Sequence, residues 1–344
     1  CNADESEPGT FKDRELLRWT PHQVIEGMII AAYAIQAEHA YVYCRGEFFE
    51  TTQVLAKAVE EAYEAGYLGK DILGSGVNVD LTVHCGGGAY ICGEETALMN
   101  SLEGRRGTPR VKPPFPAQAG YMGMPSTVNN VETLASVPFI IGKGADAYRA
   151  NGTEESPGTK LFCVSGHVRK PGNYELPLGF PLMELINDVC GGMREGRTLK
   201  GVIPGGSSVP ILNAEECESC LLSFEGVIEA GSQLGCAAVI IMDDSTDIVK
   251  AVRRMVDFYA HESCGQCTPC REGSAWVGKI LKRIEDGRGT EEDLDTLMDV
   301  TSQMEGTTIC VLSDSVAAPV QSSITKFREE YLARIRTGEK VGVA

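Results

Sequence analysis

The sequence predicts a chain of three parts: an α/β domain, a small α+β domain and a C-terminal bundle of four helices. Three observations support this prediction. The first part contains a strand–helix–strand pattern, the middle contains short alternating strands, and amphipathic helical periods follow one another from residue 244 onward. We place the domain boundaries at 1–152, 158–243 and 244–344, with a polar linker rich in glycine and proline between the first two.

The first domain is predicted from a strand, a helix and a second strand in succession. Residues 40–44 and 77–83 alternate as strands, and residues 51–64 have helical periodicity. Strands joined in this way pair in parallel, and open parallel sheets bind ligands beyond the carboxyl ends of their strands. An earlier helix is expected to begin at Pro21 with Thr20 as its N-cap. Its apolar face is expected to be Ile25, Met28, Ile29, Ala32 and Tyr33.

The middle of the chain is predicted to form a small α+β domain. Residues 160–167 and 173–178 should form two strands around a turn, followed by a helix over 181–189 and strands near Val202 and at 237–241. Cys217 and Cys220 form a single CxxC pair in this domain. Without a second pair, we interpret them as ordinary thiols rather than as a redox or metal site.

The last part is predicted to be helical throughout. We expect Ser245 to cap the first helix, Trp276 to lie on the apolar face of the second, and Thr290 with Asp293 to form a capping box for the third. The fourth helix should carry Val316, Val320, Ile324, Phe327 and Tyr331 on one side. Four short-looped amphipathic helices indicate a bundle.

Charge and hydropathy exclude several classes of partner. The 344 residues include 31 basic and 48 acidic side chains, so the net charge of −17 argues against binding to nucleic acid or anionic membranes. The longest uninterrupted apolar run, 28–35, is too short to cross a bilayer, so we expect a soluble protein. The chain opens on Cys1 rather than methionine, and we expect an N-terminal part to be missing.

Four cysteines form the most distinctive pattern in the chain. Cys264, Cys267 and Cys270 are spaced by two residues, and Cys310 follows forty positions later. Three clustered thiolates closed by a distant fourth are typical of a [4Fe-4S] cluster. A structural zinc site also accepts four thiolates but more often takes them as two separated pairs. Disulfides would require an oxidising compartment, and the 13 cysteines lie in a chain without a visible signal peptide.

A second candidate site follows the predicted strand 77–83. Glycines at 86–88 would let the backbone approach a flat ligand, and a helix starting near Glu94 would present free N–H groups to it. The alternative is a tight strand-to-helix turn. Glu94 and Glu95 would repel phosphate but could accept hydrogen bonds from ribose or ribityl hydroxyls, and acidic groups there disfavour NADP.

Three further polar segments could belong to that site. The acidic stretch 2–14 has no apolar period and is predicted to be a loop, which on composition alone is usually just solvated. Segment 112–116, Lys-Pro-Pro-Phe-Pro, is predicted to be a stiff loop that could hold Phe115 for stacking. Segment 129–133 offers amides as helix caps or as phosphate donors, with capping as the default.

Taken together, these motifs resemble one family. Asn-Ala-Asp-Glu-Ser-Glu-Pro-Gly-Thr at 2–10, Gly-Ala-Tyr-Ile-Cys-Gly-Glu-Glu-Thr at 88–96, the segments 112–116 and 129–133, and the cysteine motif are similar to signatures of the NADH-oxidising flavoprotein subunit of respiratory complex I, in its order. The related diaphorase subunits of NAD-linked hydrogenases and formate dehydrogenases share them. The resemblance implies an FMN-binding α/β domain, a ubiquitin-like β-grasp domain and a helical bundle that holds the cluster.

The resemblance also implies the ligands and their residues. FMN would lie against Asn2, Asp4, Glu5, Gly93, Glu94, Glu95, Asn129 and Asn130, and NADH near Glu7, Glu95, Lys112 and Phe115, with the four cysteines on the [4Fe-4S] cluster. NADH would pass hydride to FMN, which would release electrons singly to the cluster and onward to quinone through partner subunits, including a [2Fe-2S] thioredoxin-like subunit. No side chain would act as acid or base, and Glu95 would tune the flavin potential.

Two alternatives remain open from the sequence. The chain could be the diaphorase subunit of a hydrogenase or formate dehydrogenase, or a scaffold that keeps a cluster or zinc while its nucleotide site is dead. For the leading interpretation we expect a cytoplasmic protein that is peripheral to the inner membrane as part of a complex, without inserting into the membrane itself.

Overall fold

The computed structural model describes residues 1–337, so the last seven positions of the expected helical domain 244–344 lie outside the described residues. The described chain divides into two compact units. The first contains residues 1–6 and 11–150, and the second contains residues 7–10 and everything from 151 onward. The acidic motif at the start of the chain is therefore shared between the two units.

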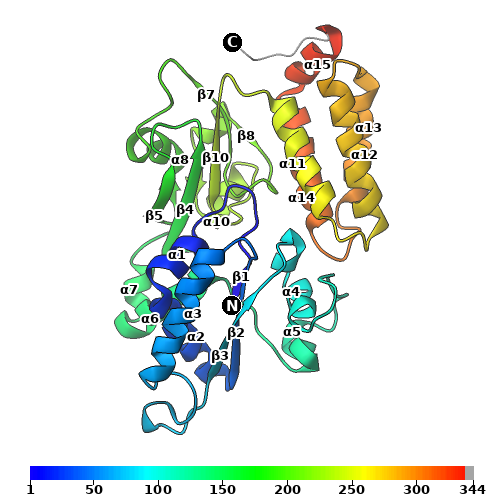
Figure 1. Cartoon of the computed structure of the whole chain (residues 1–344). Helices are drawn as coiled ribbons and strands as arrows, with labels where there is room; N and C mark the ends of the chain where they lie inside the picture. The colour runs from blue at the N-terminus through cyan, green and yellow to red at the C-terminus, as the bar shows by residue number, and fades with distance from the viewer. Residues whose placement is uncertain (338–344) are drawn as a thin grey trace. The chain divides into compact units, whose positions relative to one another are not determined.

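A parallel three-stranded sheet forms the centre of the first unit (Figure 1). Its order is β1–β2–β3, and β2 pairs in parallel with both neighbours. The strands are β1 (Asn2–Ala3), β2 (His39–Cys44) and β3 (Asp80–Cys85), and α3 (Phe49–Glu64) connects the last two. The predicted strand–helix–strand crossover is thus present. The other helices are α1 (Asp13–Trp19), α2 (Pro21–Ile35), α4 (Glu95–Leu102), α5 (Pro116–Ala119), α6 (Val131–Lys143) and α7 (Ala145–Arg149).

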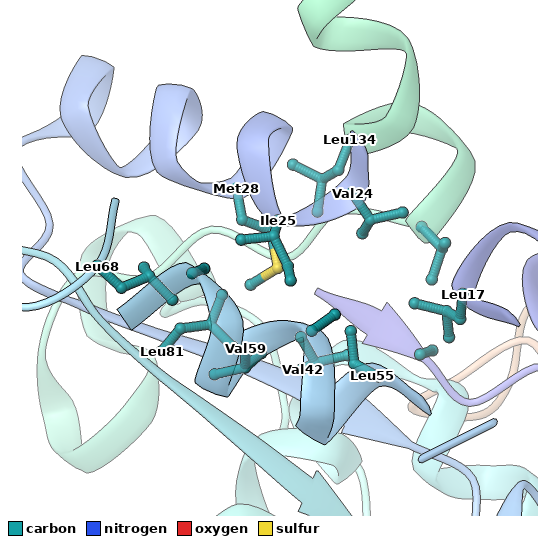
Figure 2. Packing of buried hydrophobic residues seen from close by; sticks show 14 of the residues in the cluster. Leu17, Val24, Ile25, Met28, Val42, Leu55, Val59, Leu68, Leu81 and Leu134 are labelled. Atoms are coloured by element: carbon teal, nitrogen blue, oxygen red, sulfur yellow. The ribbon is translucent and has the colours of Figure 1, made fainter. Parts of the chain in front are cut away.

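Apolar side chains from α1, α2, α3 and α6 cover one face of this sheet. Figure 2 shows Ile25 and Met28 of α2 between Val59 of α3 and Leu134 of α6. All four side chains are buried. Burial of each large aliphatic side chain stabilises the fold by roughly 1.5–3 kcal/mol. Packing on this face leaves the carboxyl ends of the strands to the loops that follow them.

Three local expectations for this unit were wrong. Tyr33 is 66% exposed instead of lying on the buried face of α2, because that face is centred on Val24 and Met28. The hydroxyl of Thr20 donates to the carbonyl of Leu16 and makes no N-cap bond. The stretch 2–14 is a loop only in its middle, since it begins in β1 and ends in the first turn of α1.

The second unit contains a five-stranded sheet of order β5–β4–β10–β7–β8. Strand β10 pairs in parallel with β4 and antiparallel with β7. The strands are β4 (Thr159–Gly166), β5 (Gly172–Pro177), β7 (Leu199–Ile203), β8 (Leu212–Asn213) and β10 (Ala238–Asp243), and a small ladder joins β6 (Phe180–Pro181) to β9 (Leu221–Leu222). The short helices are α8 (Leu182–Glu184), which continues as one π turn over Leu185–Val189, α9 (Ala214–Cys217) and α10 (Phe224–Glu229).

Five helices complete the described part of this unit: α11 (Ile248–Glu262), α12 (Thr268–Glu285), α13 (Glu291–Met304), α14 (Leu312–Lys326) and α15 (Arg328–Thr337). Helices α11 to α14 lie side by side in Figure 1, with α11 and α13 each packed against both α12 and α14. No helix in the described part of the chain combines the length and the apolar character needed to span a bilayer.

The helical part differs from expectation at three places. Asp247, not Ser245, caps α11, because its carboxylate accepts from the N–H of Lys250 whereas Ser245 bonds to Asp243. The expected fourth helix is broken at Phe327, which ends α14. Trp276 is 54% exposed rather than packed inside. The capping box of α13 is present, with the N–H of Thr290 donating to Asp293.

Candidate functional site

The four motif cysteines lie at the ends of helices in the second unit. Cys264 and Cys267 occupy the connection between α11 and α12, Cys270 lies in the first turn of α12, and Cys310 directly precedes α14. Cys270 is buried and the other three are half-buried. Connections of this kind let the backbone bend around a compact inorganic centre while the helices fix its ends.

Hydrogen bonds to sulfur support two of these thiols. The N–H of Ile309 donates to Cys267 Sγ at 3.4 Å, which ties the segment carrying Cys310 to the first cysteine motif. The hydroxyl of Ser263 lies 3.2 Å from Cys270 Sγ. Burial and the nearby thiols of Cys264 and Cys267 raise the pKa of Cys270. Clustered thiols that resist ionisation by themselves need a bound cationic centre to become thiolates.

The donor set therefore fits an iron–sulfur cluster. Its four sulfurs are soft ligands, and hydrogen bonds to sulfur are a recognised influence on cluster potentials. Among the described residues, no three or more His, Cys, Asp or Glu side chains are gathered closely enough to share one metal ion. That arrangement belongs to a single ion, whereas each cysteine of a four-iron cluster bonds a different iron.

The glycines that follow β2 and β3 form an open turn in the first unit. Cys44 and Cys85 are register partners at the carboxyl ends of the two strands. A Cβ on Gly46 would lie 2.6 Å from the carbonyl oxygen of Gly86, so the two loops require glycine to pass each other. A Cβ on Gly87 would meet nothing within 4 Å. The backbone at Gly87 is thus accessible to a flat ligand, which fits the close approach that FMN needs.

Asn2 and Asp4 organise the acidic motif within the first unit. The Asn2 side chain donates to the carbonyl of Gly93 at 2.9 Å and accepts from the N–H of Asp4 at 3.1 Å. The hydroxyl of Ser6 donates to Asp4 Oδ1 at 2.5 Å. Asn2 therefore connects the acidic motif to the segment before α4 and brings three of the predicted FMN residues together.

Glu5 is a buried carboxylate that receives three main-chain N–H groups. The donors are Lys12, Asp13 and Arg14, at 2.8, 2.7 and 3.1 Å. Burial, together with the nearby charge of Asp13, raises the pKa of Glu5 to about 7 despite these donors. Both oxygens of Glu5 satisfy the start of α1, so its first task is structural.

Asn130 also spends its polar atoms within the protein. Its Oδ1 accepts from the N–H of Glu132 and from Lys12 Nζ, both at 3.0 Å, and its Nδ2 donates to Asp13 at 2.7 Å. The expected capping role of the 129–133 segment is confirmed at α6. Asn129 contributes its carbonyl oxygen, which accepts from the N–H of Asn2 at 2.7 Å.

Glu94, Glu95 and Lys112 form an ionic cluster at the start of α4. One oxygen of Glu94 caps the helix by accepting from the N–H groups of Thr96 and Ala97, both at 2.9 Å. Lys112 Nζ lies 3.2 Å from the other oxygen of Glu94 and 2.5 Å from Glu95 Oε1. Burial lowers the pKa of Lys112, but its bonds to Glu95 and Glu94 outweigh this and raise it. The two predicted nucleotide carboxylates are therefore partly neutralised by a predicted NADH residue.

Phe115 lies at the N-cap of α5 with 54% of its surface exposed, so its ring is available for stacking. Glu7 belongs to the second unit, unlike the other predicted nucleotide residues. Its Oε1 accepts from the N–H of Ser208 at 2.9 Å and from the hydroxyl of Tyr259 at 3.2 Å. Sequence analysis missed these partners. The Gly205–Gly206 pair after β7 was the available signal for them.

Three family models match the chain in order: a Nuo51 FMN-binding domain over 1–139, an SLBB domain over 160–249, and the NADH-ubiquinone oxidoreductase-F iron-sulfur binding region over 250–334. The mitochondrial NADH-ubiquinone oxidoreductase 51 kDa subunit of Neurospora crassa is 52% identical over 97% of this chain and 68% of its own length. The chain belongs to this 51 kDa family.

Bacterial members of the 51 kDa family show the same correspondence. The equivalent component of the NADH-quinone oxidoreductase of Mycobacterium tuberculosis (strain H37Rv) is 57% identical over 98% of this chain and 75% of its own length. That of Rickettsia bellii (strain OSU 85-389) is 51% identical over 97% of this chain and 81% of its own length.

The fold is also similar to a solved structure outside these oxidoreductases. A chain of an NAD+-reducing [NiFe]-hydrogenase in its H2-reduced state superposes with a TM-score of 0.89 and 41% identity. The match covers 98% of this chain and 56% of the hydrogenase chain. This chain therefore spans little more than half of that neighbour.

Membership of the 51 kDa family confirms the main expectations from the sequence. The chain is an oxidoreductase flavoprotein subunit of the NADH-quinone oxidoreductase type, with FMN-binding and iron–sulfur binding regions and NADH as substrate. It is a subunit of a larger complex. The roles of individual residues stay predictions.

Proposed function

We propose that this chain performs the NADH-oxidising step of an NADH:quinone oxidoreductase. Bound FMN would supply the chemistry that accepts hydride from NADH and releases electrons one at a time to a [4Fe-4S] cluster, from which they pass to quinone through partner subunits. The observation that supports this most is the presence of a glycine-lined turn with its acidic cluster and a four-thiol motif in one chain of the 51 kDa family.

The protein's own contribution to this step is binding and electrostatics. We assign FMN to Asn2, Asp4, Glu5, Gly93, Glu94, Glu95, Asn129 and Asn130, and the cluster to Cys264, Cys267, Cys270 and Cys310. Because Glu5 and Asn130 already bond within the protein, their part is to hold the backbone around the ligand. Glu94 and Glu95 can accept hydroxyl groups, and Lys112 limits their repulsion of a phosphate.

NADH is assigned to Glu95, Lys112 and Phe115, and on the family resemblance to Glu7. The exposed ring of Phe115 offers an aromatic face, and stacking on such a face contributes roughly 0.5–1.5 kcal/mol beyond the area that it buries. No acid or base is needed in this assignment. Glu95 would act by setting the charge near the flavin.

We further propose the finer architecture and setting implied by the resemblance. The domains would be an FMN-binding α/β domain over 1–152, a ubiquitin-like β-grasp domain over 158–243 and a four-helix bundle from 244. The bundle corresponds to α11–α14, with α15 as an addition. The partners would include a [2Fe-2S] thioredoxin-like subunit, and the complex would keep the chain on the cytoplasmic side of the inner membrane.

Cofactor content tests this proposal at the residue level. We expect the full-length protein to contain FMN and four irons per chain, and Cys264→Ser to lose most of the iron while keeping the flavin. Cys190→Ser is the matched control, because Cys190 is a buried thiol of the same unit outside the motif. Iron and flavin analysis checks both variants. A full iron content in Cys264→Ser would contradict the cluster assignment, and a protein that never binds FMN would favour a scaffold with a dead nucleotide site.

The hydrogenase likeness supports a second candidate, the diaphorase subunit of an NAD-linked hydrogenase or formate dehydrogenase. Affinity purification from the native host separates the two. Co-purification of quinone-reductase subunits supports the leading proposal, whereas co-purification of a hydrogenase or formate dehydrogenase subunit supports the second.

A further inference from the structure

Glu7 is held in a cradle made by its own unit. The carboxylate oxygen Oε1 accepts from the N–H of Ser208 at 2.9 Å and from the hydroxyl of Tyr259 at 3.2 Å, and the Ser207 hydroxyl lies 3.4 Å away. Three donors thus converge on one oxygen atom. Hydrogen bonds to an ionised carboxylate are roughly twice as strong as neutral ones, so this convergence fixes the rotamer of Glu7.

The loop after β7 is shaped around this side chain. Gly206 has φ +95°, and a Cβ there would lie 2.6 Å from Glu7 Cγ and 2.8 Å from its Oε1. The carbonyl of Pro8 accepts from the N–H of Ser207 at 3.3 Å, which holds the main chain of the acidic motif against the same loop. The loop therefore requires glycine at a position where any side chain would displace Glu7.

Tyr259 is the donor in this cradle that is furthest from Glu7 in sequence. It lies in the last turn of α11 and is fully buried, and Ser207 Oγ is 2.5 Å from its hydroxyl oxygen. Each proton is used once if Ser207 donates to Tyr259 and Tyr259 donates to Glu7. Burial and the charge of Glu7 raise the pKa of Tyr259, so its phenol stays protonated and remains a donor.

We propose that Tyr259, assisted by Ser207, is a positioning residue for nucleotide binding because it sets the orientation of the Glu7 carboxylate. This inference rests on the proposed role of Glu7 in binding NADH. Tyr259 itself touches neither substrate nor flavin in this account. The structure supplies the reason for the role: a buried hydroxyl, built on a helix remote in sequence, donates to a carboxylate that belongs to an otherwise solvated acidic motif.

The test compares Tyr259→Phe with Tyr331→Phe in the full-length protein with its flavin and cluster. Both tyrosines are fully buried in the second unit, and Tyr331 bonds only to Ser323 Oγ at 2.7 Å among the contacts that the described residues show for its hydroxyl. Each change removes one buried hydroxyl. The measurements are KM and kcat for NADH with ferricyanide as acceptor, together with flavin content and the electron paramagnetic resonance signal of the reduced cluster.

We expect Tyr259→Phe to raise KM for NADH by about tenfold with kcat within about twofold, since it removes one hydrogen bond to a charged group that aids binding. The cluster signal and flavin content should be unchanged, and Tyr331→Phe should leave KM unchanged. If Tyr259→Phe lowers the flavin content, Ser207→Ala replaces it, because it leaves the ring in place, and a rise in KM of about threefold is expected.

Glu7→Gln separates the failure of this inference from the failure of its premise. If Glu7→Gln raises KM while Tyr259→Phe and Ser207→Ala do not, Glu7 binds NADH without the help of Tyr259 and the inference is overturned. If none of the three variants changes KM, the assignment of Glu7 to NADH is wrong and the inference falls with it. An equal rise in KM for Tyr259→Phe and Tyr331→Phe would also overturn it.

Discussion

At the scale of single residues, the candidate flavin site is built largely from groups that already serve the fold. Glu5 satisfies three N–H groups at the start of α1, and Asn130 caps α6 while holding Lys12 and Asp13. A ligand bound among them would meet side chains that are already oriented. Such preorganisation lowers the entropy cost of binding.

Glu95 offers the clearest test of electrostatics at this scale. Glu95→Gln removes a negative charge and leaves Lys112 paired with Glu94 alone, so reduction of the flavin should become easier. We expect the two-electron potential of bound FMN to rise by about 30 mV, equivalent to a tenfold change in equilibrium. A spectroelectrochemical titration measures it.

Glu64→Gln is the control for this prediction, because Glu64 is the exposed last residue of α3, away from the carboxyl ends of the strands. It should leave the flavin potential unchanged. An unmoved potential in Glu95→Gln would remove Glu95 as a tuning residue.

At the scale of elements, amphipathic periodicity and caps were sufficient for most boundaries. Strand β2 and helix α3 lie within two residues of the predicted ranges, because alternation and helical spacing record directly which side is buried. The caps of α1 and α11 escaped prediction. Glu5 acts on α1 from outside it, and Asp247 competes with Ser245 only two residues away.

The break between α14 and α15 could not be predicted either. Phe327 continues the apolar period of the expected fourth helix, so local spacing alone favours one long helix. The structure ends α14 there, and α15 places Arg334 in the interior, 1% exposed. Arg334 donates to the carbonyl of Glu285 and pairs with Asp247. A buried arginine is a tertiary feature that a single sequence does not reveal.

Asp247 therefore joins two elements and gives a stability prediction. Asp247→Ala removes the cap of α11 and leaves the buried Arg334 without its carboxylate, so we expect unfolding to cost about 4 kcal/mol less. Ser223→Ala removes a cap of α10 that has no buried ionic partner and should cost about 1 kcal/mol. Chemical denaturation measures both changes. Equal losses would show that the Arg334 pair adds nothing.

At the scale of the whole molecule, the acidic motif divides between the two compact units. Residues 2–6 belong to the first unit and residues 7–10 to the second, where Gly9 packs against Ile240 and Glu7 enters its cradle. Sequence motifs correctly indicated the family and its cofactors because they preserve residue types in order. They did not reveal this division, since it depends on contacts between Glu7 and residues about 200 and 252 positions away.

The central claim is that one chain takes electrons from NADH and delivers them to its own cluster. Anaerobic titration of the full-length protein with NADH, followed by visible absorption, tests this most directly. We predict that the flavin and iron–sulfur bands both bleach, and that in Cys264→Ser the flavin band alone responds. A spectrum that shows neither band, or that NADH leaves unchanged, would contradict the account.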